Sequence, residues 1–171
     1  GENLLDPGDT PNENLQFLLV LSCIMKAVDV HADLLRQSAS CVGNEHRLGG
    51  QEAPPAIISI CLGDQLESVV DQIVSNADSI QLLASGKLDS GVSTVPVLSR
   101  DATDRNRTTP FAFTGNKFEF RMVGSSDSIA DANVTLNAIV AEALCDAADV
   151  LEQAPDFSSA CSQLIHENMA R

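Results

Sequence analysis

Residues 117–123 alternate between polar and apolar side chains as far as Met122, and this pattern constrains the fold more than any other stretch of the chain. Successive side chains of a strand point to opposite faces, so the alternation predicts a strand with one buried and one polar face. The expected core residues are Phe118, Phe120 and Met122, and the expected polar residues are Lys117, Glu119 and Arg121. Two interpretations of the polar face stay open. It is either the solvated side of a half-buried strand, or a metal-binding carboxylate between two cations that hold the metal's anionic ligand.

Helical patterns on both sides of this strand indicate an α+β fold. Apolar residues recur there at the spacing of a helix rather than of a strand. The expected helices cover residues 10–35, 64–74, 130–153 and 158–169, and a short apolar strand is expected over residues 56–61. Residues 43–55 and 84–101 are rich in Gly, Pro or Ser and are predicted to be loops, the second with one short strand near Val95.

Two capping patterns predict where helices begin. Thr10 is expected to cap the first helix, with Pro11 at its first position and Glu13 completing a capping box. Asp64 is expected to cap the helix after the apolar strand, with Glu67 as its partner.

Charge and cysteine content exclude several classes of function. The formal charge of −14 would repel the phosphates of nucleic acids and of anionic membranes. Five cysteines without a C-x-x-C motif predict buried, reduced thiols in a cytosolic protein rather than a zinc knuckle. The apolar run at 17–24 is too short to span a bilayer. His31, on the first predicted helix, is expected to be a hydrogen-bonded packing residue, with a ligand role as the alternative.

Basic residues gather in one part of this acidic chain. Half of its ten lysines and arginines fall within 22 positions, namely Arg100, Arg105, Arg107, Lys117 and Arg121. Guanidinium groups match phosphate and carboxylate oxygens in a planar, two-point geometry. The cluster therefore predicts an anionic ligand.

Two blocks of the chain resemble the catalytic domain of glutamine synthetase, most closely its type III branch. They are G-N-E-H-R-L-G-G-Q-E-A-P-P-A at 43–56 and D-R-N-R-T-T-P-F-A-F-T-G-N-K-F-E-F-R at 104–121. The resemblance covers roughly residues 10–155. It implies a mostly antiparallel curved sheet backed by long helices. Residues 1–9 would then be a loose amino-terminal segment, and residues 156–171 the start of a carboxy-terminal helical extension.

The resemblance implies a reaction and roles for residues of the first block. In this family ATP phosphorylates the side chain of glutamate, and ammonia displaces phosphate from the γ-glutamyl phosphate, with Mg²⁺ or Mn²⁺ bound. Arg47 matches the arginine that holds the substrate carboxylate. Glu52 matches the flap glutamate that closes the site and helps to deprotonate ammonium.

The second block carries the remaining implied roles. Arg107 matches a contact to the ATP phosphates and the transferred phosphoryl group, and Lys117 occupies a basic position near the nucleotide. Glu119 matches a metal ligand. Arg121 matches an arginine that contacts the transferred phosphoryl group or glutamate. Arg105 either joins them as a ligand residue or pairs with a neighbouring aspartate, Asp101 or Asp104.

The chain also departs from the family pattern. Ala112 stands where many relatives carry another arginine, five residues after the one matching Arg107. The family's E-x-E carboxylates, its G-S-G-x-H segment and its amino-terminal domain would all lie upstream of Gly1. We therefore expect an internal piece of a larger, cytoplasmic, homo-oligomeric enzyme, inactive by itself because it carries one metal carboxylate. The alternative is a non-catalytic module derived from that enzyme that binds anions or assembles with its subunits, through sheet edges at 56–61 and 117–123.

Overall fold

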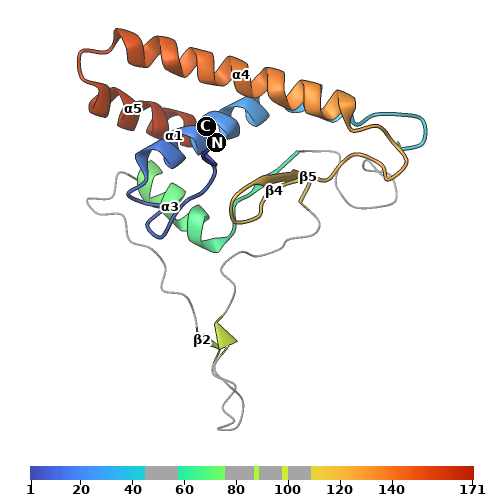
Figure 1. Ribbon diagram of the computed structural model, residues 1–171, viewed down its shortest axis with the longest axis horizontal. Coiled ribbons are helices and arrows are strands. Elements are labelled where there is room, and N and C mark those ends of the chain that lie inside the picture. Colours follow the sequence, from blue (N-terminus) through green and yellow to red (C-terminus); the bar gives the residue numbers. More distant parts are fainter. Residues whose placement is uncertain (45–57, 76–86, 89–97, 100–108) are drawn as a thin grey trace.

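The computed structural model describes residues 1–44, 58–75, 87–88, 98–99 and 109–171 (Figure 1). Helices dominate these segments, and the strands are short. In chain order the elements are α1 (Leu15–Val30), α2 (Ala32–Ser38), β1 (Ile60–Cys61), α3 (Asp64–Val74), β2 (Lys87–Leu88), β3 (Leu98–Ser99), β4 (Phe111–Phe113), β5 (Phe118–Phe120), α4 (Ala130–Gln153) and α5 (Phe157–Met169). The mixture confirms the α+β class predicted from the sequence.

The helices stack in a layer over the sheet. The long helix α4 runs along one side of the molecule, α1 and α5 lie beneath it, and the hairpin of β4 and β5 lies below them (Figure 1). The predicted ranges 130–153 and 158–169 are confirmed to within one residue by α4 and α5. Asp156 caps α5, because its side chain accepts a hydrogen bond from the backbone N–H of Ser159.

The first predicted helix is wrong at its start. Thr10 does not cap it, since its carbonyl only closes a turn with the N–H of Glu13. The helix begins at Leu15, where the Asn14 side chain accepts the N–H of Phe17 at 3.1 Å. Asn14 thus provides the capping oxygen that was expected from Thr10, four positions later in the chain. The residue whose N–H it caps, Phe17, is buried in the core.

The same prediction is also wrong in length, because the helix breaks at His31. This residue leaves helical geometry at φ −113° and ψ 28°, and α2 continues in a new direction against α4. The imidazole Nε2 lies 3.1 Å from Oε2 of Glu142 on α4. His31 is thus a hydrogen-bonded packing residue, as expected. The branched side chains of Val28 and Val30 lower the cost of breaking the helix here.

The described strands form a small sheet, and the expected mostly antiparallel curved sheet stays a prediction. The strand order of this small sheet is β1–β4–β5, with β1 parallel to β4 and β4 antiparallel to β5. A parallel pair requires a long connection, and the chain between β1 and β4 includes α3. The three described strands therefore form a mixed sheet. A separate antiparallel pair joins β2 to β3, while Val95 lies outside the described residues.

Helix α3 confirms the predicted helix after the apolar strand, with its cap displaced by one residue. Gly63, at φ 82°, is the residue before the helix, and Asp64 is already helical. Glu67 still reaches back to the chain before the helix, where its carboxylate accepts the N–H of Leu62 at 3.4 Å.

The strand predicted at 117–123 is confirmed over Phe118–Phe120 and is shorter than expected. Met122 is fully buried, and the half-buried rings of Phe118 and Phe120 pack against the core. Phe118 stacks on Phe111 at 4.7 Å between ring centroids and meets Phe113 edge-on at 5.3 Å. These contacts hold β4 and β5 to each other, and the ring of Phe113 also lies 6.0 Å from that of Phe17 on α1.

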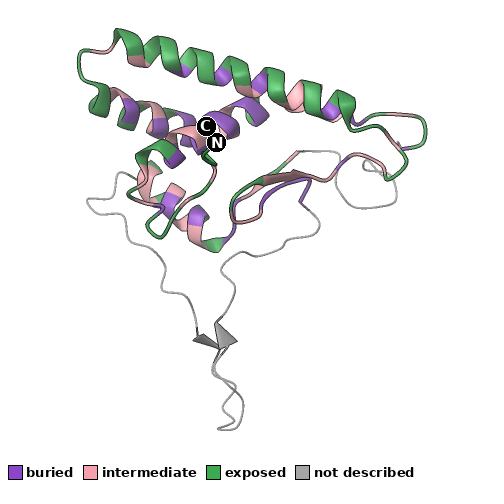
Figure 2. Cartoon of the chain, viewed as in Figure 1, coloured by how far each residue is buried: buried purple, intermediate pink, exposed green. Residues whose placement is uncertain are grey.

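Two adjoining clusters make up most of the core, and β4 contributes to both (Figure 2). Phe113 joins a cluster formed with α1, α3 and α5, whereas Phe111 joins one formed with α1, α2 and α4. All three residues of β4 are buried, because the strand is the middle one of the sheet. One short strand thus fixes the sheet against both halves of the helical layer.

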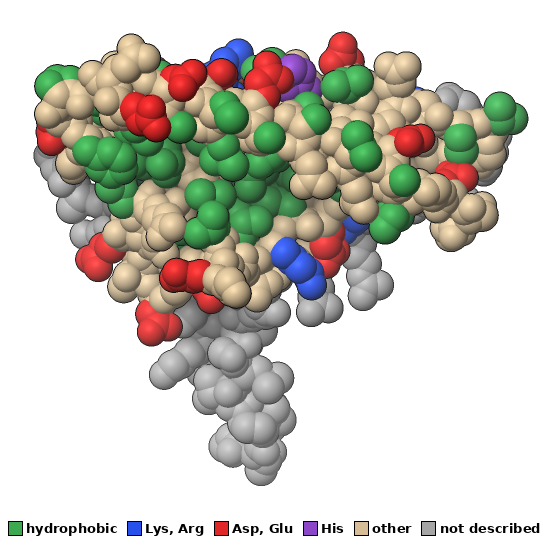
Figure 3. All heavy atoms as spheres, turned by 45° about the horizontal axis from the view of Figure 1, so that its top comes forward, with side chains coloured by type: hydrophobic (Ala, Val, Ile, Leu, Met, Phe, Trp, Pro, Cys, Tyr) green, Lys and Arg blue, Asp and Glu red, His purple; other side chains and the backbone are tan. Residues whose placement is uncertain are grey.

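All five cysteines are free thiols, but only Cys23 and Cys161 are buried, and Cys145 is exposed on α4. The expectation that all five are buried is therefore wrong. Acidic side chains outnumber basic ones on the face that carries α4, as the net charge requires (Figure 3). Within the described segments, no helix combines the length and the apolar character needed to cross a bilayer.

Candidate functional site

The polar face of β5 carries a hydrogen-bonded ion pair. Arg121 donates to Glu119 from Nε at 3.2 Å and from Nη2 at 2.9 Å, and both bonds end on the same oxygen, Oε2. The Arg121 side chain is 21% exposed and that of Glu119 is 42% exposed. The pair thus lies at the surface, with the guanidinium more enclosed than the carboxylate.

The hairpin fixes the backbone beneath this pair. Glu119 lies directly across from Ala112 in the register of β4 and β5. The N–H of Arg121 donates to the carbonyl of Pro110 at 2.8 Å, which extends the pairing past the end of β5. The two charged side chains are two residues apart and so project from the same face of the strand.

Ala112 gives the ion pair room on its inner side. It is buried, and it occupies the position where a larger side chain would face Glu119 across the hairpin. The residue that bonds the carboxylate is Arg121, two positions after Glu119.

The pair shifts the titration of the carboxylate. The hydrogen bonds from Arg121 are the largest cause that lowers the pKa of Glu119 below its usual value of 4.5, and Thr114 and Lys117 act in the same direction. Partial burial opposes them. Glu119 is therefore an anion at neutral pH, which is the form that ligates metal ions.

Glu119 fits a divalent cation as a single ligand. Mg²⁺ and Mn²⁺ prefer hard oxygen donors, and the Arg121 bonds engage only one of the two carboxylate oxygens. The segments that the structure describes hold no group of three or more His, Cys, Asp or Glu side chains arranged around one point. The remaining ligands would have to come from outside these segments or from water.

The structure places three of the predicted site residues. Lys117 is exposed at the hairpin turn, two residues before Glu119. Glu119 therefore lies within β5, and Lys117 and Arg121 lie directly before and after the strand.

The other predicted residues lie outside the described residues, and the structure does not place them. They are Arg47 and Glu52 of the first block, and Arg105 and Arg107 of the second. The expected contact of Arg107 with the ATP phosphates stays a prediction.

The strand β4, which pairs with β5 beneath the ion pair, was not predicted from the sequence. Phe111 to Phe113 and Phe118 to Phe120 are two short phenylalanine-containing segments, separated by Thr-Gly-Asn-Lys. Gly115 takes a φ of 93°, which favours glycine, in the middle of this turn. Gly115 and Asn116, placed between these two segments, are residues that indicate a hairpin turn.

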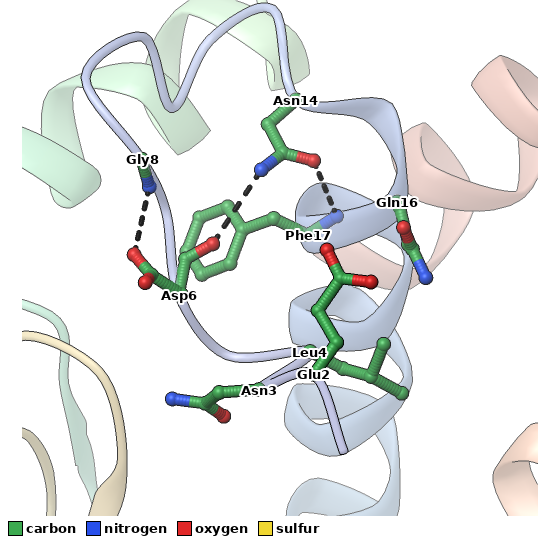
Figure 4. A pocket seen from close by; sticks show the side chains of 8 residues that line it. All are labelled: Glu2, Asn3, Leu4, Asp6, Gly8, Asn14, Gln16 and Phe17. Carbon is green, nitrogen blue, oxygen red and sulfur yellow. Dashed lines mark hydrogen bonds between the residues drawn. The ribbon is translucent and has the colours of Figure 1, made fainter.

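A hollow lies elsewhere, beside the start of α1 (Figure 4). It has a volume of about 270 Å³ and is lined by polar side chains of the amino-terminal segment together with Phe17. Asp6 Oδ1 accepts the N–H of Gly8, and the Asp6 carbonyl accepts a bond from the Asn14 side chain at 3.4 Å. These bonds hold the segment in its turn, so the groups around the hollow are engaged in local structure.

Comparison with known proteins finds close relatives. The chain is 58% identical over 144 residues to the type-3 glutamine synthetase of Dictyostelium discoideum, a match that covers 84% of this chain and 20% of the relative. It is 41% identical over 173 residues to a glutamine synthetase of Bacteroides fragilis, covering all of this chain and 22% of the relative. A glutamine synthetase of Butyrivibrio fibrisolvens is 50% identical over 120 residues, covering 70% of this chain and 17% of the relative.

These matches confirm the resemblance inferred from the two blocks. The chain spans about a fifth of the length of the curated relatives it matches. No protein-family model matches it.

Proposed function

Because the chain is homologous to type 3 glutamine synthetases, we propose that it forms part of the catalytic domain of a ligase that makes glutamine from glutamate and ammonia. The observation that supports this most directly is the ion pair of Glu119 and Arg121 on the polar face of β5. It presents a carboxylate for a cation and a guanidinium for an anion side by side, and a phosphoryl transfer needs both.

Arg121 would act on the anionic reactants. Its guanidinium would orient a carboxylate of glutamate or the phosphoryl group in transit, and it would stabilise the charge that grows on the phosphoryl oxygens. The backbone bond to Pro110 holds the residue in place, so little reorganisation is needed when the anion arrives.

Glu119 would hold a divalent ion, Mg²⁺ or Mn²⁺. When bound, such an ion neutralises charge on the phosphates of ATP and on the transferred group. Lys117, at the exposed end of the same strand, would add a positive charge near the nucleotide.

Three further roles rest on the sequence blocks alone. Arg47 would bind the substrate carboxylate, Glu52 would close the site and accept a proton from ammonium, and Arg107 would contact the ATP phosphates. The proposed organisation is a loose segment at 1–9, a partial catalytic domain at 10–155 and a helical extension from 156. A cytoplasmic location and a homo-oligomeric state are part of the same proposal.

The test is glutamine synthesis by the full-length protein, measured as γ-glutamyl hydroxamate with ATP and Mn²⁺. Glu119→Gln should lower the rate at least about 100-fold and should weaken Mn²⁺ binding measured by calorimetry. Asp146→Asn, which removes an exposed carboxylate of α4, is the matched control and should leave both unchanged. Normal turnover in Glu119→Gln would remove this residue from the site.

We expect the 171 residues by themselves to be inactive, because a single placed carboxylate cannot form a two-ion clamp. The same assay on the isolated chain checks this expectation. Turnover by the isolated chain that disappears in Glu119→Ala would overturn it.

The second candidate is a non-catalytic module that binds anions or assembles with intact subunits. The position of β1 and β5 at the two edges of the described three-stranded sheet favours it, since a sheet edge can pair with another chain. Calorimetry of the chain with ATP and with glutamate separates the possibilities. Absence of heat with either ligand removes anion binding, and a monomer at high concentration in sedimentation removes assembly.

A further inference from the structure

A buried junction joins the end of α2 to the chain that leaves β5. Its central residue, Asn44, is 2% exposed. The side-chain Nδ2 of Asn44 donates to the carbonyl of Ala39 at 2.9 Å and to the carbonyl of Met122 at 2.8 Å. Asn44 lies 78 positions before Met122, so one amide group joins two distant parts of the chain.

The junction is closely packed around this amide. A Cβ at Gly124 would lie 3.2 Å from Oδ1 of Asn44 and only 2.4 Å from Oδ2 of Asp127. The same Asp127 oxygen accepts a hydrogen bond from the Cys41 thiol at 3.1 Å. A side chain at 124 would therefore have to displace the Asp127 carboxylate and would crowd Asn44.

The bond to Met122 fixes the backbone of the candidate site. Met122 follows Arg121 directly, and its side chain is fully buried. The N–H of Arg121 is held by Pro110 on one side, and the carbonyl of Met122 is held by Asn44 on the other. The peptide groups on either side of the Arg121–Met122 linkage are therefore each hydrogen-bonded, which fixes the backbone from which the Arg121 side chain reaches Glu119.

Asn44 is suited to this task because its amide supplies two donors in fixed directions. An alanine could not donate to either carbonyl, and both would be left buried without this partner. The sequence also places Asn44 three positions before Arg47, the residue proposed to hold the substrate carboxylate.

We propose that Asn44 is a positioning residue that orients Arg121 for the anionic substrate by holding the carbonyl of Met122. The inference rests on the proposed ligase function and deepens it, because it assigns part of the substrate affinity to a side chain that does not touch substrate. It predicts that loss of the amide weakens glutamate binding beyond what a loss of stability explains.

The test compares Asn44→Ala with Asn168→Ala in the full-length protein. Asn168 is the matched control, since it is also a buried asparagine and donates to Ser22 Oγ at 3.3 Å, joining α5 to α1 instead of reaching β5. Both variants should lose thermal stability. Only Asn44→Ala should raise KM for glutamate, by about tenfold, with kcat changed less than threefold. Equal KM values in both variants and the wild type would overturn the inference.

Amide hydrogen exchange gives a second readout that does not depend on activity. The N–H of Arg121 should exchange at least about tenfold faster in Asn44→Ala and at the wild-type rate in Asn168→Ala. Unchanged exchange at Arg121 in Asn44→Ala would refute this role of Asn44 whether or not the protein makes glutamine. If the wild-type protein makes no glutamine, the ligase proposal fails separately.

Gly124→Ala is a second variant that perturbs the junction around Asn44. It replaces Asn44→Ala in the test if Asn44→Ala does not fold. The added methyl group displaces Asp127 and crowds Asn44. A smaller rise in KM for glutamate, with faster exchange at Arg121, is expected. A destabilised Gly124→Ala with normal KM and normal exchange would contradict the proposal.

Discussion

The helical layer and the β4–β5 hairpin use charged side chains in different ways. In the helical layer the ion pairs lie on the rim, as in Lys26 with Asp146 at 3.2 Å, where the carboxylate is 58% exposed. In the hairpin, Arg121 and Glu119 share one strand face, and their contact lowers the pKa of the carboxyl group. Buried apolar side chains therefore hold the helices together. The same apolar clusters include Phe111 and Phe113 of the hairpin, whose other face carries the charged pair.

The apolar core offers the largest test of this contrast. Leu21→Ala in α1 and Phe111→Ala in β4 each empty a buried site, so each should lower the free energy of unfolding by about 3–5 kcal/mol. Only Phe111→Ala removes a ring that stacks on Phe118, so only it should return the Glu119 pKa toward 4.5. Urea unfolding measures the first effect, and carboxyl NMR titration measures the second.

Phe157→Ala is the control for both variants. Because the Phe157 ring is 58% exposed, its removal should lower the free energy of unfolding by less than about 0.5 kcal/mol. A Leu21→Ala variant that moves the Glu119 pKa as far as Phe111→Ala does would break the distinction between the two regions.

The start of α1 gives the next largest effect. Asn14→Ala removes the side chain that caps the helix and should lower the free energy of unfolding by about 1 kcal/mol. Thr10→Ala should have almost no effect, because Thr10 contributes a backbone carbonyl to a turn. Chemical denaturation of the two variants compares the cap that the structure shows with the cap that the sequence predicted.

The hairpin ion pair should contribute less, and its contribution should depend on pH. A carboxyl group with a lowered pKa stabilises the fold at neutral pH, and the stabilisation is lost as the pH falls through the folded-state pKa. Glu119→Gln should therefore lower stability by less than about 1 kcal/mol at pH 7, because the side chain is 42% exposed. The difference from the wild type should vanish in acid, well below pH 4.5.

Asp146→Asn breaks the rim pair of the helical layer and should have a smaller effect at pH 7. Denaturant titrations at pH 7 and in acid supply both comparisons. A larger effect of Asp146→Asn at pH 7 would reverse the order of the two pairs.

The smallest expected effect concerns thiol reactivity near the hairpin. The hydrogen bond to Asp127 is the main cause that raises the pKa of Cys41, so its thiol should react slowly at pH 8. Asp127→Asn should accelerate its labelling by a maleimide a few-fold. Cys145, exposed on α4, is the internal reference and should label at one rate in both proteins.

Much of the helical layer could be predicted, and the reason is local. The spacing of apolar residues placed α4 and α5 within one residue of their bounds, and Pro155 marked the end of α4. The break at His31 could not be read in this way, and the His31 side chain there contacts Glu142, which lies 111 positions further along the chain. A helical pattern records which face is apolar, and it does not record where the helix must bend to cover a neighbour.

In the candidate site, too, the features set by neighbouring residues were predictable and those set by distant residues were not. The alternation at 117–123 was enough to put Glu119 and Arg121 on one polar face, because the two-residue period of a strand is a local property. The parallel pairing of β1 with β4 was not predictable, because it joins residues that are 51 positions apart and share no local pattern. Asn44 was missed for the same reason, since nothing near it in the sequence points to Met122.

The family resemblance, the helices α4 and α5 and the polar face that carries the ion pair could be inferred from the residues alone. Each follows from residue types and spacings that act over a few positions. The strand order, the break in the first helix and the hydrogen bond from Asn44 to the Met122 carbonyl became visible only in the folded chain. These depend on which distant groups satisfy each other once the core has formed, because a buried carbonyl needs a donor from wherever the chain can bring one.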